Sequence, residues 1–203
     1  MTLISRLQIL PMLTLLGALT TANSYGGTIF QNVGFGDAQI AVYDPIGQSF
    51  VADDVQLTTV AFAFSNMNPA STNAPVTMSL YQGAGFGGLL LDSVTQNLPG
   101  FLPGINDPLG FIDFDFTGNS LILGATYTVA VTTSTSKYGV AYHPNDVFAG
   151  GQLFESYVTS DPFHNDPGYD MAFRVITVPE PGSATLGAMA GLAALLLRRR
   201  SGR

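Results

Sequence analysis

Apolar and polar side chains alternate, with a period of two residues, along several short segments of this chain. No segment between residues 25 and 178 sustains the 3.6-residue period of an amphipathic helix. Alternation of this kind is typical of strands with one buried face. The positions predicted to point inward are Val60, Phe62 and Phe64; Val76, Met78 and Leu80; Ile112, Phe114 and Phe116; Tyr127, Val129 and Val131; and Met171, Phe173 and Val175.

Turn signals separate these predicted strands at short intervals. They include the glycine-rich stretch Gly83–Gly88 and the pairs Pro99-Gly100, Gly118-Asn119 and Gly150-Gly151. Many short strands between dense turn signals predict an antiparallel β-sandwich. We therefore expect an all-β domain over residues 23–177.

The first 22 residues have the pattern of a secretion signal. Arg6 precedes a leucine-rich apolar stretch at residues 7–19, and small and polar residues come after that stretch. This order is typical of a signal peptide. The apolar stretch is shorter than the roughly 20 residues that a spanning helix needs. We predict cleavage after Ala22, with Ser24 as the alternative, by signal peptidase after export through the secretion machinery.

The last segment, residues 178–203, has a second distinctive order. It contains Pro179, Glu180 and Pro181, then an apolar stretch at residues 183–197, then the basic cluster Arg198, Arg199 and Arg200. As a helix the apolar stretch is about 22 Å long, short of the roughly 30 Å hydrocarbon core. It inserts if the bilayer thins and the arginines snorkel, and the arginines then stay cytoplasmic. We expect a short transmembrane helix preceded by an extended, protease-accessible stretch.

This order resembles the PEP-CTERM sorting signal of Gram-negative bacteria. The resemblance implies that an exosortase, a membrane-embedded cysteine transpeptidase, recognises Pro179, Glu180 and Pro181 as substrate residues and removes or exchanges the C-terminal tail. It also implies transient residence in the inner membrane and a final location at the cell surface or outside the cell. Such proteins are common in bacteria that make exopolysaccharide and form biofilms or flocs. A plain membrane anchor that is never cut is the alternative.

The body between these ends resembles a recurrent ectodomain of bacterial surface proteins with varied C-terminal anchors. The residues that carry the resemblance are Gln48-Ser49-Phe50, the segment Val76 to Gln82, Asp113–Phe116, Gly124–Tyr127 within Leu121 to Val131, and Asp170–Arg174. The resemblance implies a jelly-roll-like β-sandwich. It implies no activity and no catalytic residue.

Charge and composition exclude several classes of function. Residues 23–178 hold thirteen acidic and two basic side chains, a formal charge of −11. A body this acidic repels phosphate backbones, so we expect no nucleic-acid partner. The chain has no cysteine, which excludes a disulfide framework, thiolate zinc sites and a cysteine nucleophile.

The sequence does not favour an enzyme. The two histidines, His143 and His164, stand beside proline and asparagine, and no Gly-x-Ser-x-Gly motif is present. Asp113 and Asp115 share one face of a predicted strand, about 7 Å apart. A glycoside hydrolase, the weakest of the three functions considered, needs two carboxylates across a cleft. We predict no catalytic residues.

A calcium site is a hypothesis for the acidic stretch near residue 165. We interpret this stretch as a polar, turn-rich loop whose oxygen ligands would be Asp161, Asn165, Asp166 and Asp170. A second acidic group would combine Asp53-Asp54 with Asp37 and Asp44. The alternative is that these carboxylates cap turns. No other cofactor is expected.

Carbohydrate binding is the main alternative to a purely structural role. Sugars stack on exposed aromatic rings, and the last third of the body is rich in them. The candidates are Tyr138, Tyr142, Tyr157 and Tyr169. A lectin-like module of this kind, assisted by calcium, would bind extracellular polysaccharide, whereas the first prediction is a secreted surface or matrix protein with a structural or interaction role.

Overall fold

The computed structural model describes residues 26–68, 73–100, 102, 110–157, 161–166 and 168–178, with the backbone alone for Tyr157 and residues 161–166. The predicted signal peptide lies outside the described residues. So does the predicted sorting segment, with Pro179, Glu180, Pro181, Arg198, Arg199 and Arg200. None of the described segments contains a helix with the length and hydrophobicity needed to cross a membrane.

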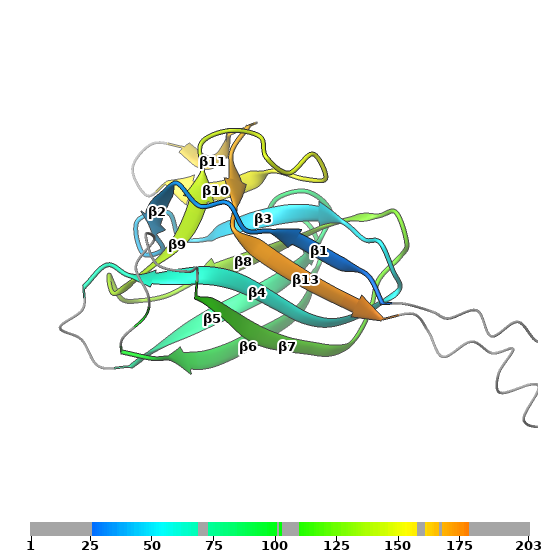
Figure 1. Ribbon diagram of the computed structural model, residues 1–203, viewed down its shortest axis with the longest axis horizontal. Coiled ribbons are helices and arrows are strands. Elements are labelled where there is room, and N and C mark those ends of the chain that lie inside the picture. Colours follow the sequence, from blue (N-terminus) through cyan, green and yellow to red (C-terminus); the bar gives the residue numbers. More distant parts are fainter. Residues whose placement is uncertain are drawn as a thin grey trace, which may run out of the picture.

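The described residues form two antiparallel sheets that face each other (Figure 1). The first sheet has the order β1-β13-β4-β9-β12, with β2 paired to β9 and β7 paired to β4. The second has the order β11-β10-β3-β8-β5-β6. The strands are β1 (Thr28–Gln31), β2 (Gly36–Gln39), β3 (Ile46–Val51), β4 (Gln56–Asn66), β5 (Ala74–Gln82), β6 (Leu90–Leu98), β7 (Phe111–Ser120), β8 (Thr126–Thr132), β9 (Tyr138–His143), β10 (Leu153–Tyr157), β11 (Asp161–Asp166), β12 (Asp170–Met171) and β13 (Phe173–Val178).

The core between the sheets consists of the side chains that alternation placed on inward faces. All fifteen predicted positions belong to it or pack against it, and only Ile112 is partly rather than fully buried. The all-β, antiparallel, sandwich-like prediction is therefore confirmed. The physical reason is that each strand contributes every second side chain to the one space from which water is excluded.

Part of β4 is also buried on its outer face, which alternation did not predict. Ala63 forms a small cluster with Ala141 and Ala172, and the ring of Phe111 packs against it. Arg174 extends over the same ring, with its guanidinium carbon 5.7 Å from the ring centroid. Alanines on this outer face therefore serve as contact sites for a covering aromatic side chain.

The predicted loop after residue 160 contains a strand instead. Strand β11 pairs with β10, with Asn165 opposite Phe154 and His164 opposite Glu155. Alternation could not reveal it, because residues 161–166 read Asp-Pro-Phe-His-Asn-Asp and apolar and polar side chains do not alternate there. This corrects the interpretation of Asp161–Asp166 as a turn-rich loop.

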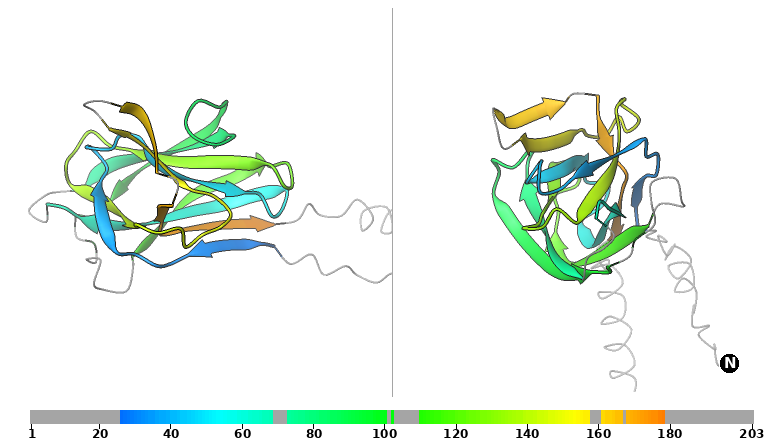
Figure 2. Two further views of the ribbon diagram at one scale, coloured as in Figure 1. Left: turned by 90° about the horizontal axis from the view of Figure 1, so that it is seen from above. Right: turned by 90° about the vertical axis from the view of Figure 1, so that its left-hand side faces the viewer.

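Both ends of the described body lie at one end of the sandwich. Strands β1 and β13 pair with Thr28 opposite Ile176, and the amide of Thr177 donates to the carbonyl of Gly27 over 3.1 Å. We call this the exit end; Figures 1 and 2 show the start of β1 and the end of β13 side by side there. Strand β3 ends at the exit end. Its last residue, Val51, pairs with Thr126, and the next residue, Ala52, is hydrogen-bonded to the turn before β8. The first residue of β3, Ile46, therefore lies at the opposite end.

Candidate functional site

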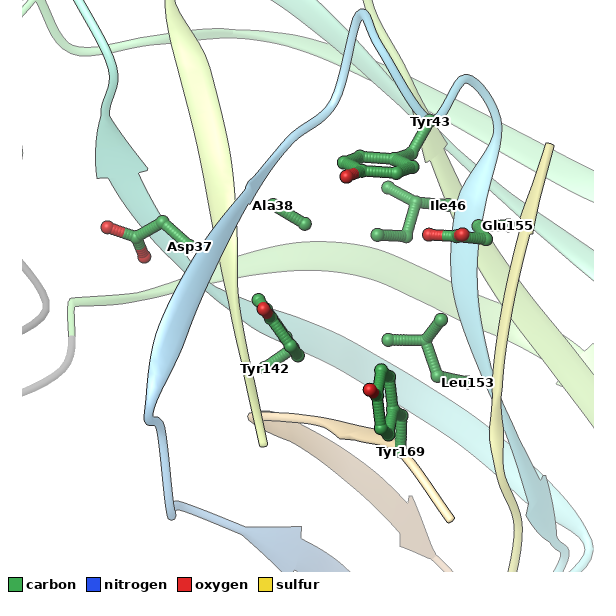
Figure 3. A pocket seen from close by; sticks show the side chains of 8 residues that line it. All are labelled: Asp37, Ala38, Tyr43, Ile46, Tyr142, Leu153, Glu155 and Tyr169. Carbon is green, nitrogen blue, oxygen red and sulfur yellow. The ribbon is translucent and has the colours of Figure 1, made fainter. Parts of the chain in front are cut away.

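A pocket of about 120 Å³ opens at the end of the sandwich remote from the exit end (Figure 3). Its walls come from β2, β3, β9 and β10 and from the residues just before β3 and β12. The lining residues are Asp37, Ala38, Tyr43, Ile46, Tyr142, Leu153, Glu155 and Tyr169. Three tyrosines and two acidic residues around the apolar side chains of Ala38, Ile46 and Leu153 make this the candidate ligand site.

The three tyrosines approach the pocket from different elements. The rings of Tyr142 and Tyr169 have centroids 6.0 Å apart and planes inclined by 35°. Tyr43 lies across the pocket from them, and Ile46 lies beside it (Figure 3). The arrangement offers aromatic surface with phenolic hydroxyls at its margin, which suits a ligand with both apolar faces and hydroxyl groups.

Gly36 makes room for Tyr142. A Cβ atom at position 36 would lie 3.0 Å from Cε1 of the Tyr142 ring. Strand β2 pairs with β9 so that Gly36 stands directly opposite Tyr142. A side chain here would displace the ring, so the glycine is part of the construction of the pocket wall.

Asp37 has its carboxylate directed away from the pocket (Figure 3). Its Oδ1 and the nearby Ser65 Oγ are both buried without a hydrogen-bond partner among the described residues. Desolvation by burial raises the pKa of Asp37, and the neighbouring Ser65 hydroxyl lowers this pKa by a smaller amount.

We therefore expect Asp37→Asn to stabilise the domain at neutral pH. Since the folded-state pKa is raised, stability is full below the unfolded pKa of 3.8 and falls as pH rises through the folded pKa. The neutral amide avoids that loss. Thermal unfolding should show a higher midpoint for the variant at pH 7 and no difference at pH 3. An equal difference at both pH values would contradict this account.

Of the four tyrosines predicted to bind glycans, the structure brings together Tyr142 and Tyr169. Tyr138 is 1% exposed, and its hydroxyl donates to the carbonyl of Leu98 over 2.9 Å and accepts from the amide of Ala74 over 3.1 Å. Tyr138 is thus a core residue and offers no face to a ligand. The side chain of Tyr157 lies outside the described residues.

Tyr43 and Glu155 were not predicted from the sequence. Tyr43 stands two residues before Pro45. This position, an aromatic side chain next to a turn signal, is the one local feature that could have identified Tyr43 as a candidate binding residue. The predicted sugar-stacking rings all lie in the last third of the body, far along the chain from Tyr43. Glu155 lies on β10, opposite Ile46 of β3, and no local pattern in the sequence predicts that these two strands pair.

Asp170 has a structural role that the calcium hypothesis did not anticipate. It is 1% exposed, and Oδ1 accepts a hydrogen bond from Gln48 Nε2 over 3.0 Å. Its Oδ2 accepts from the amides of Val147 and Phe148, each over 2.8 Å. Gln48 in turn accepts from the amide of Met171. The carboxylate therefore joins β12 to β3 and to the loop after β9, and the calcium hypothesis for Asp170 stays a prediction.

The other predicted calcium ligands are not brought into a described site. The side chains of Asp161, Asn165 and Asp166 lie outside the described residues. Among the described side chains, no three of histidine, aspartate and glutamate lie close enough together to hold a metal ion. The second acidic group is divided, since Asp53 bonds Thr177 at the exit end and Asp37 lies on β2 at the other end.

The carboxylates on β7 have local partners. Asp113 forms an ion pair with Arg174, and Asp115 accepts from the amide of Thr117 over 2.9 Å. The hydroxyl and then the amide of Thr117 lower the pKa of Asp115. A glycosidase acid needs a raised pKa, so the geometry gives no support to that role. The side chain of His143 packs edge-on against Phe35 and contacts Asn145.

Comparison with known proteins adds no functional assignment. No family model matches this chain, and no curated protein matches it. The functional argument therefore rests on the residues and on their arrangement in space.

Proposed function

We propose that this chain is a secreted protein, displayed at or released from the bacterial cell surface, whose sandwich has a structural or interaction role. The signal-like N-terminal segment and the resemblance of residues 178–203 to a PEP-CTERM signal support it. We also propose that the two sheets form a jelly-roll-like sandwich. The observation that carries the proposal is the position of the two ends of the body, side by side at the exit end.

This position allows removal of both end segments without damage to the fold. Strand β13 ends at Val178, immediately before Pro179, and its backbone is bonded to β1 and β4 up to that point. An exosortase cut at Pro179, Glu180 and Pro181 therefore leaves every described strand in place. The proposed partners are the exosortase, signal peptidase, the secretion machinery and, transiently, the inner membrane.

The test is the mass of the mature chain in a host with exosortase and in the same host without it. We expect the surface or released form to lack both residues 1–22 and the arginine cluster, and the exosortase-deficient host to retain the cluster. Glu180→Gln should block processing. Glu155→Gln, which changes the chain's other glutamate, should not. An intact Arg203 on the surface form would overturn the proposal.

A second candidate function is carbohydrate binding in the tyrosine-lined pocket. The specific observation is that Tyr43, Tyr142 and Tyr169 converge there although they are far apart in the sequence. Polysaccharide presents hydroxyl groups and apolar ring faces, and the pocket presents phenols around Ile46 and Leu153.

We expect the wild-type protein to be retained on polysaccharide from the producing cells. Tyr142→Ala and Tyr169→Ala should each weaken retention about two- to tenfold, the value of an aromatic contact. Tyr81→Ala is the matched control, because Tyr81 packs on Phe86 away from the pocket. Repeating the assay with calcium and with a chelator tests ion assistance. Equal retention of all variants would exclude the pocket as the sugar site.

A further inference from the structure

Large aliphatic side chains gather, exposed, at the exit end of the sandwich. Leu89, Ile122 and Leu123 are 65%, 64% and 63% exposed. We call the whole group the apolar end; its members are Val51, Leu89, Leu90, Leu91, Ile122, Leu123 and Val178. The other exposed large hydrophobic side chains among the described residues are Phe30, Val33, Phe35, Met67, Val147 and Tyr169. Single exposed apolar residues are ordinary, whereas an apolar surface made by several neighbouring residues suits contact with another apolar phase.

Backbone and side-chain bonds hold these residues around one end of the fold. The turn between β7 and β8 carries Ile122 and Leu123, and Gly124 in that turn donates to Ala52, next to Val51. Asp92, beside Leu91, accepts from the side chain of Asn119 over 2.7 Å, which ties the start of β6 to the end of β7. Val178 pairs with Gln56, which pairs with Ser120 on the other side of β4.

The fold does not require aliphatic residues at these sites. The β7–β8 turn is closed by the bond from the Ala125 amide to the Ile122 carbonyl, with Gly124 at a φ of 77°. Neither Ile122 nor Leu123 enters the core, whereas the preceding Leu121 does. Serine or threonine would satisfy the same backbone, so neither the turn nor the core requires aliphatic side chains at positions 122 and 123.

The position of the predicted membrane segment identifies the occupant. The apolar stretch at residues 183–197 begins five residues after Val178. Five extended residues reach about 17 Å at most. Once that stretch is inserted, the lipid surface lies within this distance of Val178, which is the last described residue and a member of the apolar end.

We propose that the apolar end rests on the lipid surface while the chain is membrane-bound, and so holds the Pro179–Pro181 stretch at the membrane–water boundary, where a membrane-embedded peptidase acts. This inference rests on the proposed function. Contact is made by aliphatic side chains in the headgroup layer, and not by charge, since Asp53, Asp54 and Asp92 border the same end. Anionic lipid should therefore weaken it.

The absence of cysteine from the chain provides the test. In the chain spanning residues 23–203, Leu123→Cys or Phe35→Cys introduces a single labelling site for an environment-sensitive fluorophore. Phe35 is the matched control, because it is 69% exposed and lies beside β2 at the opposite end. Each labelled chain is reconstituted into phosphatidylcholine vesicles with or without brominated acyl chains, and flotation reports insertion.

Quenching by brominated lipid is expected at position 123 and not at position 35. Adding Leu89→Ser and Leu91→Ser to the Leu123→Cys chain should reduce the quenching toward the level at position 35, and anionic lipid should reduce it as well. Flotation with equal quenching at both positions would overturn the lipid contact and leave the proposed function intact. A chain that does not float would overturn both.

Discussion

Replacing Asp170 by alanine is expected to destabilise the domain by about 3–5 kcal/mol, because it removes one buried carboxylate from three donors at once. Gln48 Nε2 and the amides of Val147 and Phe148 would lose their acceptor in a site closed to water. Domains of this size have about 5–15 kcal/mol of stability in total. The loss should appear as a large fall in the urea midpoint of unfolding.

Two comparisons make this result specific. Asp146→Ala changes an exposed carboxylate of the same loop and should alter stability by less than about 0.5 kcal/mol. Asp170→Asn keeps one acceptor oxygen, so its free energy of unfolding should lie between that of the alanine variant and that of the wild type. This variant provides a folded protein to measure even if Asp170→Ala does not fold. The deficit should be the same with calcium and with a chelator. A deficit that appears only with calcium would contradict this account and would support Asp170 as an ion ligand.

Phe173→Ala should have the next largest effect, about 3–5 kcal/mol. Phe173 is fully buried in the last strand of the body, where its ring meets that of Phe148 edge-on with centroids 5.0 Å apart. The substitution leaves a cavity between the sheets and removes the packing partner of the loop that also depends on Asp170.

Phe30→Ala is the matched control for that variant. Phe30 is exposed on β1 and meets Phe111 on the outer face of the sheet. Its loss should cost less than about 1 kcal/mol. Urea unfolding of both variants measures the difference, and equal losses would show that the core has been assigned to the wrong face of β13.

The two ends of the sandwich have different surfaces. The apolar end adjoins the point where the chain leaves the body, and the tyrosine-lined pocket opens at the opposite end. If the apolar end rests on lipid, the pocket faces away from the membrane and toward extracellular material. The polysaccharide assay and the vesicle assay test these two surfaces independently.

Local pattern was sufficient to predict which side chains form the core. Strands β4, β5, β7, β8, β12 and β13 carry the inward residues that alternation indicated, because the pleat alone determines which side chains share a face. The same pattern could not separate Tyr138 from Tyr142. The two share a face of β9 with Val140, and yet one is buried and the other lines the pocket.

Short-range periodicity and composition were enough to establish the all-β class, the strands with inward residues, the core positions and the acidic character of the body. They could not show that Tyr43 joins Tyr142 and Tyr169, that Asp170 bonds Gln48 from 122 residues away, or that the exposed leucines and isoleucine share the exit end. Those features came from the folded arrangement alone. Burial and contact at such positions depend on which distant strands cover each end of the sandwich, and the order of strands in a sheet is not encoded in any local pattern.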